Sequence, residues 1–153
     1  MVPRGDAART AAMETYFHDV AAALDGLVAA GETYTANFSS ETSDFTRFNQ
    51  GKASQPGNVV PPYADVDLME GARHASHRLS LSGDLPSDRE RLRAAVAGLR
   101  AALPDLDPDP HLLIATDVVS TRTARGGSLP PAEVVIDDLL GAGRGQDLVG
   151  LYA

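Results

Sequence analysis

The stretch TYTANFS at residues 33–39 decides the fold, because its side chains alternate between polar and apolar with a period of two. Tyr34, Ala36 and Phe38 fall on one side of an extended chain, and threonine, asparagine and serine fall on the other. Such alternation predicts a β-strand with one face on a core and the other in water. A sheet therefore begins here, and the flanking segments must supply what covers it.

The segment before this strand predicts a helix that ends at Gly31. Its apolar side chains recur at offsets of three and four along residues 13–28, which places them on one helix face. A glycine just past the last periodic residue can adopt the left-handed conformation that closes a helix. Residues 1–6, with Pro3 and Gly5, predict a disordered lead-in, so that a single domain spans residues 7–153.

The rest of the chain predicts further strands and two more helices. Short extended segments at 44–48, 64–68 and 72–81 complete an antiparallel meander of about four strands. The apolar segments 112–119 and 147–153 predict additional strands. Ser87 and Glu90 form a capping-box pattern at the start of a second helix, and Pro130 with Pro131 opens a third. Strands and helices together predict a mixed α/β fold of the α+β kind.

Composition excludes several classes of protein. The 153 residues include 13 Lys plus Arg, 21 Asp plus Glu and no Cys, for a net charge of -8. Zero cysteine excludes a disulfide scaffold, a thiolate zinc site and a cysteine nucleophile. The acidic charge argues against nucleic-acid binding, because phosphate backbones are repelled. The chain has neither a signal peptide nor an apolar run of roughly 18 residues, so we expect a cytoplasmic protein without membrane contact.

The residue patterns that could carry chemistry all have a simpler interpretation. His74 and His77 stand three apart, but on a strand they face opposite sides and cannot share one ion. The glycines at 141–145 follow a helix and precede a strand, which is the reverse of a phosphate-binding loop. Asp65 and Asp67 predict the wet face of a sheet. The sequence therefore predicts no catalytic, metal or cofactor-binding residue.

Several segments resemble the N-terminal region of the TldD/PmbA (TldE) family, once called modulators of DNA gyrase. They are SSETSDFTRFNQGK at 39–52, QPG at 55–57, GARHA at 71–75, LSLSGD at 79–84 and DLVGLYA at 147–153. The resemblance implies an α/β domain in which two to three helices pack on one side of a curved, largely antiparallel sheet of about five to six strands. It also implies that the chain continues into a longer parent protein.

The function implied by the resemblance is proteolysis or peptide processing. TldD-type members resemble zinc metallopeptidases that act on unfolded or precursor peptides beside a metal-free PmbA partner, and their zinc ligands lie in the C-terminal part. This chain would be a non-catalytic domain that holds no cofactor and helps to form the peptide path and a homodimer or heterodimer interface. The candidates for that role lie on the segment after the first strand: Asp44, Phe45, Arg47, Phe48, Asn49 and Gln55.

Two hypotheses of different class remain at this point. In the first, an unfolded peptide adds to a sheet edge at 44–49 by main-chain hydrogen bonds. In the second, the chain is a stand-alone interaction or regulatory module without peptidase activity, whose sheet and apolar tail at 148–152 dock another protein. A reading frame that continues past Ala153 into a His-Glu-x-x-x-His element would favour the first hypothesis.

Overall fold

The chain forms two compact units. The computed structural model describes residues 4–41, 43–59, 62–127 and 130–153, and of residues 4–7, 43–44 and 54–59 it describes the backbone alone. Within that part, the major unit comprises residues 4–40 and 62–124. The minor unit comprises residues 41, 43–59, 125–127 and 130–153. The single domain expected over 7–153 is thus divided into two separately packed parts.

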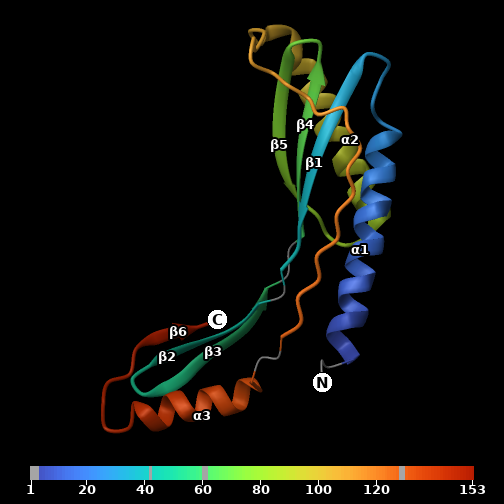
Figure 1. The fold of residues 1–153 in the computed structure, drawn as a ribbon. Helices are drawn as coiled ribbons and strands as arrows, with labels where there is room; N and C mark the ends of the chain where they lie inside the picture. Colours follow the sequence, from blue (N-terminus) through green and yellow to red (C-terminus); the bar gives the residue numbers. More distant parts are fainter. Residues whose placement is uncertain (1–3, 42, 60–61, 128–129) are drawn as a thin grey trace. The chain divides into compact units, whose positions relative to one another are not determined.

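The major unit places two helices on one face of a three-stranded antiparallel sheet (Figure 1). Its elements are α1 (Arg4–Asp25), β1 (Glu32–Ser39), β4 (Tyr63–Glu70), β5 (Arg73–Ser80), α2 (Leu85–Ala102) and the 3-10 turn η1 (Leu103–Asp105). The strand order is β1-β4-β5, with both partners antiparallel to β4. β4 is therefore the central strand, and β1 and β5 form the two edges.

The core of the major unit lies between this sheet and the helices. Every second residue of β4 is buried, from Ala64 through Val66 to Leu68. Against them pack buried side chains from both helices, from β5 and the residue after it, and from η1: Tyr16, Val20, Leu24, Leu79, Leu81, Leu92, Val96, Leu99 and Leu103. Tyr34, Ala36 and Phe38 of β1 pack on the same cluster, as the alternation of 33–39 predicts.

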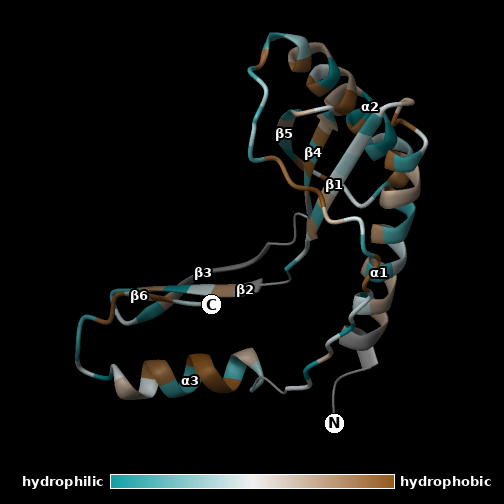
Figure 2. Cartoon of the chain, turned by 45° about the horizontal axis from the view of Figure 1, so that its top comes forward, coloured by the Kyte–Doolittle hydropathy of each residue, from teal (hydrophilic) through white to brown (hydrophobic). Residues whose placement is uncertain are grey.

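The minor unit is a second three-stranded antiparallel sheet with one helix. β2 (Ser43–Asn49) lies between β3 (Lys52–Val59) and β6 (Gly150–Tyr152), and α3 (Ala132–Ala142) contacts β3. α3 is apolar along much of its length (Figure 2). Gln50 and Gly51 join β2 to β3 with φ angles of 52° and 67°, which matches the two-residue hairpin turn that requires positive φ at both positions.

The antiparallel α+β fold with six strands is confirmed, and some details differ. The strands form two sheets instead of one. α1 begins at Arg4, inside the predicted lead-in. α2 begins at Leu85, earlier than predicted, because Pro86 is favourable in the first turn of a helix. Its N-cap is Asp84, whose carboxylate accepts a hydrogen bond from the Ser87 N–H. The capping box of Ser87 and Glu90 was therefore wrong.

The strand predicted at 112–119 is also wrong. The segment is irregular, with a bend at Asp117, and pairs with no strand of the described chain; it leaves the side chains of Leu113, Val118 and Val119 largely exposed. β-propensity describes how well side chains fit a half-buried sheet face, so it is realised only where a neighbouring strand offers hydrogen bonds.

Replacing Leu92 tests the core. Its side chain is 0 % exposed, so we expect Leu92→Ala to lower the free energy of unfolding by about 2–5 kcal/mol through lost burial and a residual cavity. Val118→Ala is the control, because Val118 is 99 % exposed and its loss changes stability by less than about 0.5 kcal/mol. Urea denaturation followed by circular dichroism measures both, and equal midpoints would contradict the assignment of Leu92 to the core.

Candidate functional site

The residues predicted from the sequence all lie on the β2–β3 hairpin, but they do not form one surface. Phe48 is buried on one side of β2, whereas Arg47 and Asn49 are exposed on the other and Phe45 is half-buried. Arg47 lies opposite Gln55 of β3, and β2 continues back through Asp44. The side chains of Asp44 and Gln55 lie outside the described residues.

β2 is a poor place for a peptide to add, because it is the inner strand of its sheet. β3 pairs with it from Ser43 to Asn49, and β6 pairs with it from Thr46 to Phe48 on the other side. The backbone groups of Thr46–Phe48 are therefore engaged on both sides. Strand addition needs an edge with unpaired N–H and C=O groups, which the middle of β2 does not offer.

β5 of the major unit does offer such an edge (Figure 1). In an antiparallel ladder, successive residues direct their N–H and C=O groups alternately toward the partner strand and away from it. The Leu81 N–H donates to Pro62 O across the β4–β5 pair at 2.8 Å, which sets the alternation. The even-numbered residues of β5 consequently direct their backbone groups outward, away from β4.

Two contacts close the ends of this outward row. Ala72 O accepts from the Asp109 N–H at 2.7 Å, and Ser80 O accepts from Arg91 Nη1 at 3.1 Å. Between them lie the outward groups of His74, Ser76 and Arg78, on which the described residues place no hydrogen-bond partner. We call this row, from His74 to Arg78, the β5 edge. It is long enough to pair with a short extended peptide.

An apolar groove runs beside the β5 edge on the helix side of the sheet. Its volume is about 720 Å³. One wall is formed by β5, with Ala75, Ser76, His77 and Leu79, and by Leu106, which follows η1. The opposite wall is formed by α2, with Arg91, Ala94, Ala95, Gly98, Leu99 and Ala102. The side chains of a strand added to β5 would alternate between this groove and the opposite face of the sheet.

The opposite face of β5 carries paired charges. Arg78 donates to both carboxylate oxygens of Asp65, at 2.6 and 2.9 Å, and this contact lowers the pKa of Asp65. His74 lies between two carboxylates, with Nδ1 at 3.3 Å from Asp67 and Nε2 at 3.6 Å from Asp109. Asp65 and Asp67 thus do lie on the wet face, where they contact Arg78 and His74 of the neighbouring strand.

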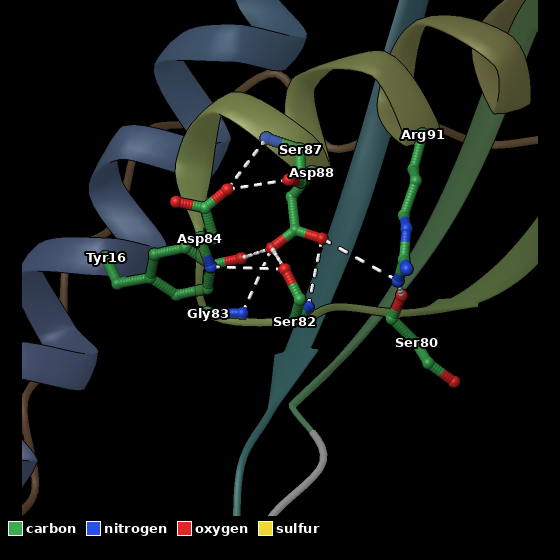
Figure 3. A network of polar contacts seen from close by, with 8 residues as sticks. All are labelled: Tyr16, Ser80, Ser82, Gly83, Asp84, Ser87, Asp88 and Arg91. Atoms are coloured by element: carbon green, nitrogen blue, oxygen red, sulfur yellow. Dashed lines mark hydrogen bonds and ion pairs between the residues drawn. The ribbon is translucent and has the colours of Figure 1, made fainter.

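A buried carboxylate fixes the geometry where β5 meets α2 (Figure 3). Asp88, in the first turn of α2, is 0 % exposed. Its oxygens accept from the Ser82 N–H at 2.9 and 3.0 Å, the Ser82 hydroxyl at 3.0 Å and the Gly83 N–H at 3.1 Å. The Tyr16 hydroxyl of α1 donates to the same carboxylate. The network ties α1, the turn after β5 and α2 together.

These hydrogen bonds determine the ionisation of Asp88. Burial alone raises the pKa of a carboxyl group, but the donors from Tyr16, Ser82 and Gly83 outweigh it and hold the pKa of Asp88 below its usual value. Burial and the same carboxylate raise the pKa of Tyr16. Asp88 is therefore a charged structural group with satisfied oxygens. Its role could not be read from the sequence, where it is one acid among many.

Comparison with known proteins adds no family. No protein-family model and no curated protein matches this chain. Within the part that the structure describes, no three histidine or acidic side chains lie close enough together to hold a metal ion. None of the described helices combines the length and the apolar character needed to cross a membrane.

Replacing Asp88 by asparagine tests the network. We expect Asp88→Asn to lower the free energy of unfolding by about 3 kcal/mol, because buried donors lose a charged acceptor. The low pKa means that the stabilisation by the Asp88 carboxylate is complete above the unfolded pKa, about 4, and is lost as the pH falls through the folded value. The wild type should therefore lose more stability than the variant as the pH falls below about 4.

The matched control is Glu90→Gln on the same helix. Glu90 pairs with Arg93 at the surface, so its loss should change stability by less than about 0.5 kcal/mol and leave the acid dependence unaltered. Thermal melts at several pH values measure both variants. An Asp88→Asn protein with wild-type stability at neutral pH would show that the carboxylate does not hold the three segments together.

Proposed function

We propose that this chain is a non-catalytic, peptide-binding domain of the TldD/PmbA type, which holds an extended segment of an unfolded peptide at the β5 edge. The observation that carries the proposal is the row of outward backbone groups from His74 to Arg78, lying beside an apolar groove. Main-chain hydrogen bonds give affinity with little demand on sequence, which suits a domain that serves unfolded substrates.

The proposal moves peptide binding from β2, where the sequence suggested it, to β5. In a parent of this type, the domain would supply the peptide path while a separate portion carries zinc and cleaves the chain. We propose a homodimer or a heterodimer with a second family subunit as the working assembly. The likeness to this family rests on the sequence segments at 39–57, 71–84 and 147–153.

A second candidate function is a stand-alone protein-interaction module. One observation favours it: the irregular segment from Leu113 to Val119 exposes large apolar side chains, with Leu113 at 93 % and Val118 at 99 %. Exposed apolar stretches of this kind mark surfaces that a partner covers. Under this alternative, removing the side chains of Leu113 and Val118 would abolish partner binding and leave peptide binding at β5 unchanged.

Ser76→Pro tests the proposed peptide site. Proline removes the outward N–H of Ser76, which lies on an edge strand where the ring is tolerated. We expect a fluorescent, end-blocked peptide of alternating valine and threonine to bind this variant at least about tenfold more weakly than the wild type, because a main-chain hydrogen bond is lost and the ring blocks pairing. Fluorescence anisotropy measures the dissociation constants.

Ser76→Thr is the matched control, since it keeps the N–H and should bind the peptide as the wild type does. A copy of the peptide that is N-methylated at alternate positions should fail to compete, because it cannot donate to β5. Circular dichroism confirms that each variant is folded. If the proline variant or the methylated peptide bound normally, the β5 edge would not be the site.

A further inference from the structure

The groove lining carries one permanent charge, and it is positive. Among the lining residues, Arg91 of α2 is a cation and none is an aspartate or glutamate; the remainder are apolar except for Ser76 and His77. The whole chain, by contrast, carries a net charge of -8. A largely apolar groove with one guanidinium is complementary to a ligand that brings apolar side chains and a carboxylate.

Arg91 has hydrogen-bonding capacity left for such a carboxylate. A guanidinium carries five N–H donors, and Nη1 of Arg91 donates to Ser80 O while standing 3.9 Å from Asp88 Oδ1. The Asp88 oxygens already accept from nearer donors, so they need no strong bond from Arg91 (Figure 3). The Arg91 side chain is 54 % exposed, which leaves its fork accessible for bidentate pairing.

The position of Arg91 also matters, because it marks one end of the β5 edge. Its contact with Ser80 O places it beside the last outward carbonyl of the strand. A peptide paired with His74–Arg78 would direct alternate side chains toward α2, and the one nearest Ser80 would meet Arg91. The other helix-facing side chains of the peptide would lie over Ala94, Ala95 and Gly98, which offer only apolar contacts.

The other end of the groove offers a ligand carboxylate no charged partner among its lining residues. There Asp109 closes the row by donating its N–H to Ala72 O, and the groove is lined by Ala102 and Leu106. The nearby Arg73 uses its Nε to donate to Leu106 O at 2.7 Å. Within the groove lining, Arg91 is therefore the guanidinium that a ligand carboxylate can reach.

We infer that the β5 edge selects peptides in which small apolar residues alternate with others and an aspartate or glutamate side chain lies next to Arg91. This inference rests on the proposed peptide binding and adds the substrate class. Backbone pairing supplies most of the affinity, and the carboxylate fixes the register, because a slip of two residues would move it away from Arg91.

The test compares three end-blocked peptides of alternating valine and threonine that differ in one terminal residue. We expect the peptide ending in glutamate to bind about fivefold more tightly than the one ending in glutamine, and the one ending in lysine to bind more weakly than both. Raising the salt concentration should reduce the glutamate preference and leave binding of the glutamine peptide unchanged. Fluorescence anisotropy gives each constant.

Arg91→Gln should bring the ratio of the dissociation constants of the glutamine and glutamate peptides from about five to about one. Arg93→Gln is the matched control on the same helix, because Arg93 pairs with Glu90 and does not line the groove. Thermal melts establish that the variants are folded.

The outcomes separate this inference from the proposed function. Equal binding of all three peptides, or a glutamate preference that survives Arg91→Gln, would overturn the inference and leave peptide binding in place. If no peptide bound, both proposals would fail. Self-association of the chain that peptides do not compete with would show that a second copy occupies the edge, which also overturns the inference.

Discussion

The packing of the apolar face of β4 against α1 and α2 is the interaction on which the rest of the major unit depends. Ala64, Val66 and Leu68 are almost fully buried and occupy the middle of the sheet. With β4 in the centre, β1 and β5 must be the edges, and α2 must lie over β5. The open edge and the groove beside it therefore follow from the placement of one strand.

The buried Asp88 then sets how accurately that edge is held. A carboxylate that accepts from α1 and from the turn after β5 fixes the start of α2, and Arg91 lies one turn further along the same helix. Arg91, the residue proposed to recognise a ligand, thus lies on a helix whose start is held by the buried Asp88 carboxylate, and both oxygens of that carboxylate accept hydrogen bonds. A binding group supported in this way loses little freedom when a ligand arrives.

The sequence predicted most elements, but it could not indicate which strands lie at the sheet edges. The period-two pattern of 33–39 and the helical spacing of Tyr16, Val20 and Leu24 report burial directly, and both were confirmed. The position of a strand in its sheet depends on the order in which the strands pair. Local sequence patterns do not encode that order. Residues 44–49 have a strand sequence, yet only the order β3-β2-β6 reveals that Thr46–Phe48 in their middle are paired on both sides. The strand expected at 112–119 failed because β-propensity cannot report that no partner strand is present.

The place of the β2–β3 hairpin in the chain has a consequence for folding. It separates β1 from β4, so the two strands meet only after the chain between Ser39 and Tyr63 has closed a long loop. β4 and β5, in contrast, are joined by the tight turn at Gly71 and Ala72. Closing a longer loop costs more conformational entropy, so the β4–β5 hairpin can nucleate early while β1 docks late. We therefore expect the major unit to assemble in a fixed order, with β5 paired to β4 before β1 completes the sheet.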